Sequence, residues 1–371
     1  MDLGAFLPQH PLRILHLTLA ADAGGLSRYV LDLMAAMHAR GHQVEVAGDD
    51  GAWMGRFPFD HYEKIPLKGG LSGFRQSVKD VHDLLKHQHA DLIHTHYRRA
   101  TLLARRLKSN LPILYTLHLS HMSLRWPRRW LSDWGDHTHV ASSDARDWLI
   151  NDARVRPERI TMIPHGVDVD RFTLPSASRK LDARVDLGLA PMDLVALFVG
   201  RFDYPKNEQW LIDVLLAARP KINDLKMVIV GEGPREGQLR QRIAREALED
   251  RVKIFNDTKL LSAYHAADAV LLPSIREGFS LVCAEAMSCG VPCLRTRTSG
   301  TRELIIENVT GCSTPIDRTA FVDAAVEFLS DRQRLREMGV AGAALIREHF
   351  TFDRQVEQTI ALYRRLIERK S

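Results

Sequence analysis

Cysteine and long hydrophobic runs are scarce in this 371-residue chain. Four cysteines are too few for a disulfide framework. Cys283, Cys289 and Cys293 lie close together but lack the paired C-x2-C spacing of a zinc site, so core packing is the better interpretation. No apolar run reaches the roughly 18 residues of a membrane span, and the N-terminus has no cleavable apolar stretch. These absences predict a cytoplasmic protein.

A dinucleotide-binding loop is also missing, because "ADAGGLS" after the first predicted strand does not extend to G-x-G-x-x-G. The composition is that of a soluble globular protein, with 45% hydrophobic residues, 26% charged residues and a formal net charge of +5. The length of the chain predicts two domains of about 100–200 residues each.

Short apolar runs typical of strands alternate along the chain with longer helical patterns. "PLRILHLTLA", a glycine loop, the helical "RYVLDLMAAMHARG" and "HQVEVAGD" form a strand–helix–strand unit, which indicates a parallel sheet. The alternation pauses in a polar, turn-rich stretch near residues 168–185 and restarts at "LVALFVGRF". We therefore predict an α/β protein with two doubly wound domains, residues 1–175 and 176–351, and an amphipathic C-terminal helix over 352–371.

Ligands of doubly wound sheets bind at the carboxyl ends of the strands, so the loops there are the candidate sites. In the second predicted domain, "GRFDYPKN" carries Arg201 and Lys206, two cations that suit a diphosphate. A surface loop with two solvated cations is the alternative. "VGEGP" lets a ligand approach the backbone at Gly231 and Gly233, although a strand-to-helix turn often needs glycine as well.

The first predicted domain has glycines and histidines at its strand ends. Gly24 and Gly25 precede the first helix, whose N-terminal amides could meet a phosphate or a sugar. His94 and His96 share one strand face and could hold a metal, but no third ligand is evident. His118 ends the next strand, where a polar group could touch the reacting centre.

An aspartate-x-aspartate pair, Asp168 and Asp170, is of the type that holds manganese in some transferases. It lies at the start of the predicted connection between the domains, where aspartate commonly caps a loop. The structural interpretation is therefore favoured.

The positive charge is concentrated between Arg98 and Arg129, with no acidic residue between them. A solvated helix face explains "RRATLLARRLK", whereas "HMSLRWPRRWLSDW" interleaves Arg125, Arg128 and Arg129 with Trp126, Trp130 and Trp134. Because tryptophan favours the membrane interface and arginine is attracted to anionic lipid, we hypothesise contact with an anionic membrane surface or a phosphorylated acceptor. Core tryptophans beside solvated arginines are the alternative. Nucleic acid is not expected, because no binding module accompanies the patch.

Two glutamates, Glu277 and Glu285, bracket the apolar stretch "EGFSLVCAE". A helix is predicted to begin near Ser280, so that its free amides and positive dipole end point at the preceding loop. With most of the gap helical, the carboxylates lie on the order of 10 Å apart, too far for a cooperating acid pair on one bond. This spacing suits two anchors on a long ligand, a sugar hydroxyl and a ribose, with phosphate on the amides between them.

At this motif the chain resembles the retaining family 4 glycosyltransferases, which share the E-x7-E pattern of "EGFSLVCAE". The similarity extends over nearly the whole chain, through "AGGLSRYVLDLMAAMHARGHQVEV", "DLIHTHY", "MIPHGVDVDRF", "VGRFDYPKN" and "AVLLPSIREGFSLVCAEAMSCGVPCL". The resemblance implies the GT-B fold, in which two Rossmann-like domains face each other across a cleft and a C-terminal helix crosses back onto the first. It also implies metal-independent transfer from a nucleotide-sugar donor bound mainly by the second domain.

The resemblance also assigns roles to positions of this chain. Arg201 and Lys206 would hold the diphosphate, Glu277 the sugar hydroxyls and Glu285 the ribose, while Gly25 would approach the donor and His118 would lie beside the anomeric centre. The predicted catalytic residues are His118, Arg201, Lys206 and Glu277. The predicted donor-binding residues are Gly24, Gly25, Arg201, Lys206, Gly231, Gly278, Phe279, Ser280, Leu281 and Glu285, with no metal and no cofactor. Arg302 in "TSGTREL" departs from the Gly-Gly pair common in the family, so we expect it to alter the nucleotide or sugar pocket.

The expected activity is that of a retaining hexosyltransferase that uses a UDP- or GDP-sugar. Its acceptor would be a cell-envelope glycan or glycolipid, and the protein would be cytoplasmic or peripheral on the inner face of the membrane. A nucleotide-sugar epimerase of the same fold and a non-catalytic sugar-nucleotide-binding protein are the alternatives. The epimerase would need its own acid and base, and a silent binding protein has no evident need for the whole set of predicted site residues.

Overall fold

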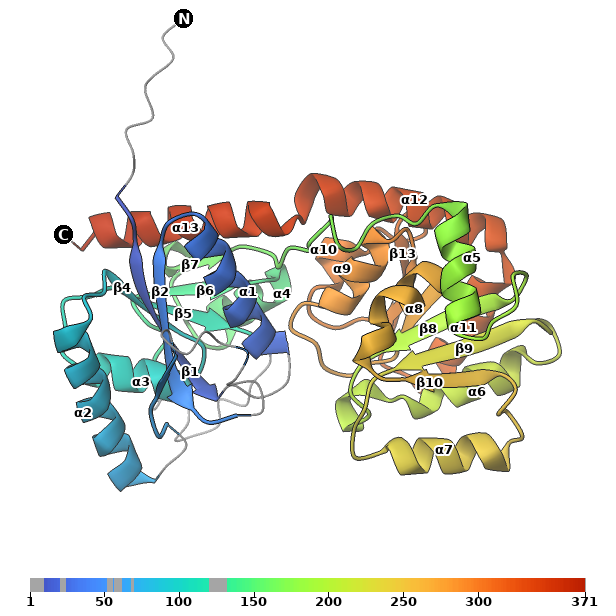
Figure 1. Ribbon diagram of the computed structural model, residues 1–371, viewed down its shortest axis with the longest axis horizontal. Helices are drawn as coiled ribbons and strands as arrows, with labels where there is room; N and C mark the ends of the chain where they lie inside the picture. Colours follow the sequence, from blue (N-terminus) through green and yellow to red (C-terminus); the bar gives the residue numbers. More distant parts are fainter. Residues whose placement is uncertain are drawn as a thin grey trace, which may run out of the picture. The chain divides into compact units, whose positions relative to one another are not determined.

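The computed structural model describes residues 10–20, 25–51, 56, 62–67, 70–119 and 132–370. Internal contacts divide the chain into two compact units, each built on one parallel sheet (Figure 1). The first unit comprises residues 1–141, 145–163 and 356–371, and the second comprises residues 142–144 and 164–355. The main segment of the second unit begins at Pro164, whereas the sequence analysis set the boundary after residue 175.

Within the described part of the chain, the first unit has a seven-stranded parallel sheet in the order β3-β2-β1-β4-β5-β6-β7. Its strands are β1 (Arg13–Ala20), β2 (Gln43–Asp49), β3 (Tyr62–Lys64), β4 (Leu92–Thr95), β5 (Ile113–Leu117), β6 (His137–Val140) and β7 (Ile160–Met162). Its helices are α1 (Gly25–Ala39), α2 (Leu71–His87), α3 (Arg98–Arg106) and α4 (Ser143–Asn151), joined by most of the C-terminal α13 (Phe352–Glu368).

Side chains of this sheet alternate between two very different faces. Leu15, Leu17 and Ile93 pack with apolar residues of α2 and α3 in a buried core. His16 and His94 point to the opposite face, where Tyr363 of α13 bonds to His94. The period-two alternation of a strand thus gives one apolar face and one face with buried polar groups.

The helix α13 buries a stripe of side chains against the first unit. Val356, Thr359, Tyr363 and Leu366 are buried at the three- to four-residue spacing of a helix face. Val356 and Tyr363 in this stripe are fully buried. Phe352, Ile360 and Ile367 are only half-buried, because the stripe passes one position beside them.

In its described residues the second unit has a six-stranded parallel sheet in the order β10-β9-β8-β11-β12-β13. The strands are β8 (Leu194–Val199), β9 (Leu225–Val230), β10 (Val252–Phe255), β11 (Ala269–Leu272), β12 (Cys293–Thr296) and β13 (Gly311–Thr314). The helices are α5 (Ala177–Asp186), α6 (Gln209–Ala218), α7 (Glu236–Arg245), α8 (Leu260–Ala266), α9 (Leu281–Ser288), α10 (Thr301–Leu304), α11 (Arg318–Ser330) and α12 (Arg332–His349).

Both sheets reverse their strand order beside their first strand, between β1 and β4 and between β8 and β11. In doubly wound sheets the carboxyl ends of the strands at this switch point are where ligands bind. The residues that follow β1, β4, β8 and β11 are therefore the first place to look for a site.

The stretch 168–185, predicted as a polar connection, instead contains α5 of the second unit. Ser176 caps this helix by accepting a hydrogen bond from the backbone N–H of Arg179. The buried guanidinium of Arg184 donates to the carbonyl oxygen of Ala266 and to Asp268. These partners lie far along the chain, so the local pattern did not reveal the helix.

The cysteine cluster lies in the core of the second unit, as the sequence predicted. Cys283, Cys289 and Cys293 are at most 2% exposed. The Sγ of Cys283 lies 3.7 Å from the Sδ of Met287. Burial raises the pKa of the Cys289 thiol to about 12, so this thiol stays protonated and packs as a small apolar group.

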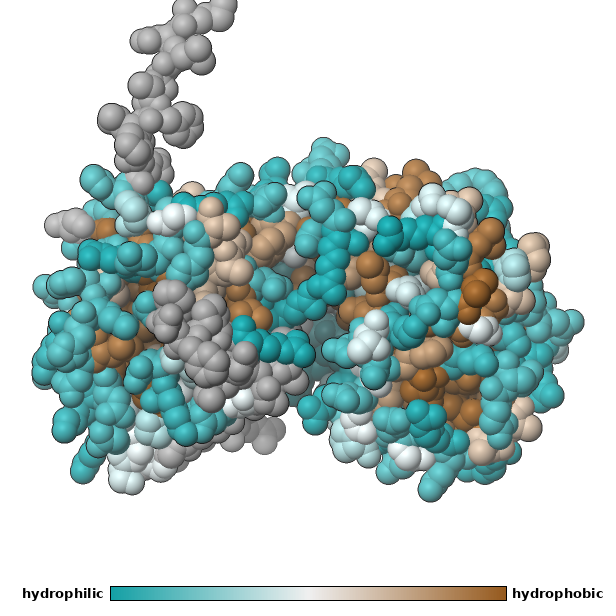
Figure 2. Space-filling view, in the orientation of Figure 1, coloured by the Kyte–Doolittle hydropathy of each residue, from teal (hydrophilic) through white to brown (hydrophobic). Residues whose placement is uncertain are grey.

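The surface in the view of Figure 2 is mainly hydrophilic, with scattered apolar side chains. Val185 and Met192 are the most exposed of the described large hydrophobic residues, at 73% and 77%. None of the helices in the described ranges has both the length and the apolar character needed to cross a bilayer.

Candidate functional site

An ion pair joins the loops that follow β8 and β11, the two strands at the switch point of the second unit. Lys206 ends the 3-10 turn Tyr204–Lys206 after β8, and Glu277 lies in the loop after β11. The Nζ of Lys206 donates to Oε1 of Glu277 at 2.6 Å. Only 23% and 14% of the two side chains are exposed, so the pair is shielded from water.

Backbone hydrogen bonds hold the same two loops together. The N–H of Ile275 donates to the carbonyl oxygen of Pro205 at 2.8 Å. The side-chain amide of Asn207 donates to the carbonyl oxygen of Pro273 at 3.0 Å, with Asn207 in the left-handed conformation that asparagine tolerates. Lys206 and Glu277 are therefore placed by a rigid backbone frame.

Glu277 is ionised despite its burial. Burial pushes the pKa of its carboxyl upward, but the charge and hydrogen bond of Lys206 and the charge of Arg295 outweigh it and hold the pKa below the usual range. The carboxylate is thus an acceptor for hydrogen bonds from a ligand at any pH near neutrality.

Arg295 is a buried cation that the sequence reasoning did not single out. It lies in β12, is 1% exposed, and its Nη2 donates to Oγ1 of Thr298 and the carbonyl oxygen of Ser299. Its Nη1 has no hydrogen-bond partner among the described residues. The available signal was a charged residue inside the apolar run "VPCLRT". Two cations beside one carboxylate leave the centre positive, which favours an anionic ligand.

The helix α9 begins where the sequence predicted. Ser280 caps it by accepting a hydrogen bond from the backbone N–H of Cys283 at 3.4 Å, and Leu281 is its first residue. Gly278 and Phe279 form the preceding loop, and the Phe279 ring meets the His165 ring edge-on. Further along the helix, Oε2 of Glu285 accepts a hydrogen bond from the Tyr264 hydroxyl at 2.8 Å. Glu277 and Glu285 therefore have different partners.

Arg201 and the glycine loop differ from Lys206 in how they are held. The side chain of Arg201 is 65% exposed and lies 3.4 Å from Asp203. A Cβ at Gly231, where φ is +150°, would lie 2.0 Å from the carbonyl oxygen of Gly200. A Cβ at Gly233 would lie 2.6 Å from the carbonyl oxygen of Phe202. These glycines are required by the packing of two loops, and the donor-binding role of Gly231 stays a prediction.

In the first unit, hydrogen-bonded polar side chains lie on one face of the sheet. The hydroxyl of Thr116 in β5 is 2.6 Å from Nε2 of His94 in β4 and 2.9 Å from Nδ1 of His139 in β6. His139 in turn donates through Nε2 to the carbonyl oxygen of Ile163 at 2.9 Å. Nδ1 of His94 is 2.7 Å from the hydroxyl of Tyr363.

A second set of contacts leads from this face to His118, which follows β5. Nδ1 of His16 in β1 is 2.9 Å from Nε2 of His96, and Nδ1 of His96 is 3.0 Å from Nε2 of His118. The rings of His94 and His96 are 4.3 Å apart, which confirms that they share one side of the strand. Tyr29 of α1 meets His118 edge-on.

The buried histidines are neutral, because burial lowers their pKa values. The pKa of His16 is lowered to about 3 and that of His139 to about 4, while those of His94 and His96 lie well below the usual range. His16 joins His94 and His96 as a third potential metal ligand, which the sequence analysis did not identify. Its signal was positional, since β1 pairs with β4 and sets His16 directly beside His94.

The predicted loop cap at Asp168 is confirmed. Its Oδ1 accepts hydrogen bonds from the backbone N–H groups of Asp170 at 3.1 Å and Arg171 at 3.0 Å. Arg302 forms an ion pair with Asp144, which belongs by its contacts to the same unit, with 2.7 Å between Nη2 and Oδ1. Its expected effect on the donor pocket stays a prediction.

Part of the basic run is neutralised locally. Arg105 of α3 forms ion pairs with Asp133 and Asp136. The ring of Trp134 packs against Tyr115 and Trp148 in a core cluster, so the core interpretation holds for this tryptophan. The other predicted contacts, Arg125, Trp126, Arg128, Arg129 and Trp130, lie outside the described residues, as does Gly24. Gly25 is the first residue of α1.

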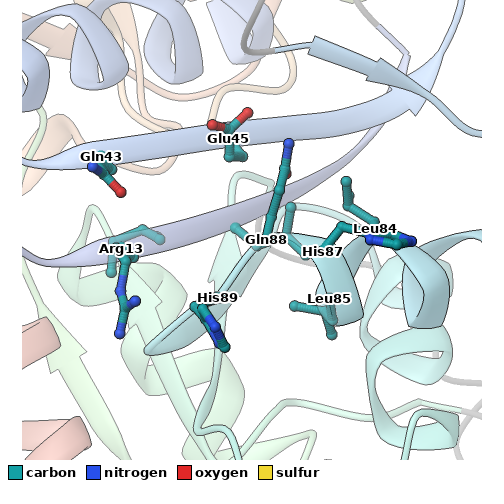
Figure 3. A pocket seen from close by; sticks show the side chains of 11 residues that line it. Arg13, Gln43, Glu45, Leu84, Leu85, His87, Gln88 and His89 are labelled. Atoms are coloured by element: carbon teal, nitrogen blue, oxygen red, sulfur yellow. The ribbon is translucent and has the colours of Figure 1, made fainter.

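A hollow of about 240 Å³ lies elsewhere, at the amino ends of β1 and β2 and the end of α2 (Figure 3). Arg13, Gln43, Glu45 and Gln88 are among its labelled lining residues. Because ligands of doubly wound sheets bind at the carboxyl ends, this hollow is no candidate for the main site.

Known protein families match both units. A model described as glycosyl transferases group 1 matches residues 180–344, and one described as glycosyltransferase family 4 matches residues 23–171. The chain belongs to these glycosyltransferases. The predicted family is thereby confirmed, and the charged centre around Lys206 and Glu277 lies inside the first of the two matches.

Two named relatives match this chain to different extents. A D-inositol 3-phosphate glycosyltransferase of Jonesia denitrificans is 28% identical, over 93% of this chain and 92% of its own length. A lipopolysaccharide core biosynthesis mannosyltransferase of Rhizobium meliloti is 32% identical, over 56% of this chain and 61% of its own length.

Solved structures show the same fold. HepE of Anabaena, solved in complex with UDP, superposes with a TM-score of 0.81 at 22% identity and covers 95% of this chain and 99% of its own. Sucrose-phosphate synthase of Thermosynechococcus elongatus gives 0.79 at 24% identity and covers 96% of this glycosyltransferase and 99% of its own chain. The predicted GT-B class of two Rossmann-like α/β domains is confirmed.

Proposed function

We propose that this glycosyltransferase moves a sugar from a UDP- or GDP-sugar to an acceptor, with retention of the anomeric configuration and without a metal ion. The observation that carries the proposal is the Lys206–Glu277 pair at the switch point of the second unit, with the buried Arg295 beside it. A surplus of positive charge there suits a diphosphate, and the ionised carboxylate suits the hydroxyls of a sugar.

The proposed site residues of the second unit have distinct roles in the sugar transfer. Lys206 and Arg201 stabilise the charge that develops on the diphosphate as the sugar leaves as an oxocarbenium-like species. Glu277 accepts hydrogen bonds from the sugar, and Glu285, oriented by Tyr264, binds the ribose. The amides at the start of α9 add a third group that attracts phosphate. These groups supply the charge stabilisation that other transferases obtain from a divalent cation.

The acceptor we propose is a cell-envelope glycan or glycolipid. One named relative supports this class, since its name places it in lipopolysaccharide core biosynthesis. The inositol phosphate in the name of the other relative is a small soluble acceptor. Contact of the segment 121–134 with an anionic membrane surface remains a separate hypothesis. Vesicle co-sedimentation of the protein with Arg125, Arg128 and Arg129 changed to Ser tests it, and unchanged sedimentation would contradict it.

Turnover of a donor panel tests the proposed function. The purified protein is incubated with UDP- and GDP-sugars, with and without candidate acceptors and with excess chelator, and release of UDP or GDP is followed. We expect release that depends on an acceptor and persists with chelator, and a product whose anomeric proton coupling matches that of the donor. A changed sugar without nucleotide release would indicate an epimerase, and binding without turnover would indicate a silent binding protein.

A further inference from the structure

A subset of the polar groups on one face of the first unit's sheet forms one unbroken hydrogen-bonded chain, which we call the histidine chain. In order, it runs through the Ile163 carbonyl, His139, Thr116, His94, Tyr363, His16, His96 and His118. Its longest link, between the Tyr363 hydroxyl and Nε2 of His16, measures 3.5 Å, and the others lie between 2.6 and 3.0 Å. It therefore connects the C-terminal helix to a residue at the end of β5.

The inner half of the histidine chain has one arrangement of protons. A carbonyl oxygen only accepts, so His139 donates to Ile163 from Nε2 and, being neutral, accepts at Nδ1. The single hydroxyl proton of Thr116 must go to that Nδ1. Thr116 can then only accept from His94, which donates from Nε2 and accepts at Nδ1.

The same logic fixes the outer half. The hydroxyl proton of Tyr363 goes to Nδ1 of His94, so its oxygen accepts from Nε2 of His16. His16 accepts at Nδ1 from Nε2 of His96. His96 accepts at Nδ1 from Nε2 of His118. Every proton in the bonds from Ile163 to His118 is thereby assigned.

Burial supports this assignment. His16, His94, His96 and His139 are at most 2% exposed, and burial lowers the pKa values of all four, so none carries the second proton that would reverse a link. A continuous set of such bonds is cooperative, because each donor is polarised by the bond that it accepts.

A shared metal ion is the competing interpretation. Ring nitrogens of His16, His94 and His96 lie within 4.8 Å of one another. A neutral imidazole can offer a metal only its unprotonated nitrogen, here Nδ1 of each residue. All three Nδ1 atoms already accept hydrogen bonds from chain members, so an ion would have to break three bonds. The hydrogen-bonded chain satisfies these groups without one.

We propose that the histidine chain is a positioning device for His118, which it orients with Nε2–H directed inward, so that the neutral form of the ring presents Nδ1 as an acceptor. In that form Nδ1 accepts hydrogen bonds from donors such as hydroxyl groups and not from an ionised phosphate oxygen. This last step rests on the proposed function. His16, His94, His96, His139, Thr116 and Tyr363 are positioning residues, and Tyr363 gives the C-terminal helix a part in setting His118.

The test uses two tyrosine-to-phenylalanine variants in the full-length protein. Tyr363→Phe removes the hydroxyl that joins the two halves of the histidine chain and keeps the buried ring. Tyr115→Phe is the matched control, because Tyr115 is 3% exposed in β5 and packs in the core cluster on the other face of the same sheet. If Tyr363→Phe does not fold, Thr116→Val cuts the histidine chain at its next link.

The first readout is the nitrogen NMR spectrum of the histidine rings, assigned for His118 by its loss in His118→Gln. We expect one neutral tautomer of His118 in the unmodified protein and in Tyr115→Phe, and a mixture with protonated Nδ1 in Tyr363→Phe. Unchanged His118 signals in Tyr363→Phe, or protonated Nδ1 in the unmodified protein, would overturn the proposal. So would one tightly bound transition-metal ion per chain by elemental analysis.

The second readout is kinetic and depends on activity. We expect kcat/KM of Tyr363→Phe to fall about 2- to 10-fold, the factor that one hydrogen bond of ordinary net strength is worth, with Tyr115→Phe unchanged. An equal loss in both variants would point to general destabilisation and overturn the positioning role. If the unmodified protein turns over no nucleotide sugar, the proposed function fails, while the tautomer measurement still decides the histidine chain.

Discussion

The two units place opposite kinds of polar chemistry at equivalent points of the same fold. At the switch point of the second unit, Lys206, Glu277 and Arg295 are charged and nearly enclosed. At the switch point of the first unit, His16, His94 and their partners are enclosed and neutral. Both sheets have the same strand order around this point, so topology does not set the difference.

The difference lies in how each group offsets the cost of its burial. In the second unit each charge has an opposite charge nearby, and one cation remains in excess. At the switch point of the first unit the buried histidines stay neutral, and each donor meets an acceptor along the histidine chain. A charged centre binds phosphate, whereas a neutral network with fixed tautomers distinguishes hydroxyl groups by hydrogen-bond direction.

Removing the charge of Lys206 in the second unit should have the largest effect on activity. Lys206→Ala leaves Glu277 without its ion pair and removes charge stabilisation from the departing diphosphate, so we expect kcat to fall roughly 10²–10³-fold. Lys259→Ala is the matched control, because Lys259 forms an exposed ion pair with Asp186 in the same unit. Full activity in Lys206→Ala, measured by nucleotide release, would contradict the role of this residue.

Acid should destabilise the first unit before the second. Histidines whose folded pKa lies below the unfolded value of 6.5 add stability that is complete above pH 6.5 and is lost as pH falls toward about 3 to 4. Glu277 has its pKa lowered from 4.5, so its contribution is lost only below that pH. In the described residues the lowered histidines are His16, His42, His94, His96, His137 and His139 in the first unit and His265 in the second.

We therefore expect the first unit to open first as the pH is lowered from 6.5 toward 4.5. Hydrogen exchange followed by mass spectrometry checks this expectation, with peptides from β1 and β4 compared with peptides from β8 and β11 and rates corrected for pH. Earlier loss of protection in β8 and β11 would show that the buried histidines do not control acid stability.

A smaller effect tests the loop frame of the second unit. Gly231→Ala forces a Cβ toward the carbonyl oxygen of Gly200 at a positive φ, so we expect a loss of roughly 1–3 kcal/mol in the free energy of unfolding. Gly237→Ala is the control, since nothing lies within 4 Å of its Cβ position in α7 and alanine favours a helix by about 0.5–1 kcal/mol. Urea unfolding measures both, and equal stabilities of the two variants would disprove the packing explanation.

Local patterns predicted the elements that local forces determine. The helix predicted in "RYVLDLMAAMHARG" is α1 (Gly25–Ala39), and the one predicted over 352–371 is α13 (Phe352–Glu368). The start of α9 near Ser280 follows from its capping side chain. The family motifs likewise located Lys206 and Glu277, because both lie in short loops after predicted strands.

Features that depend on distant partners could not be predicted in this way. The helix α5 is anchored by Arg184 to Asp268, and its own sequence looked like a connection. His16 and Tyr363 belong to the histidine chain only because β1 pairs with β4 and α13 covers that face. Arg295 is one cation in an apolar strand, and its nearness to Glu277 arises from the order of β11 and β12.

Calorimetric binding of UDP and GDP to three proteins tests the contrast between the units most directly. The unmodified protein should bind at least one of them, Lys206→Ala should bind it at least tenfold more weakly, on the order of 1.4 kcal/mol, and Tyr363→Phe should bind it as the unmodified protein does. Nucleotide binding that survives in Lys206→Ala, or that is lost equally in Tyr363→Phe, would contradict a charged nucleotide site in the second unit and a neutral positioning network in the first.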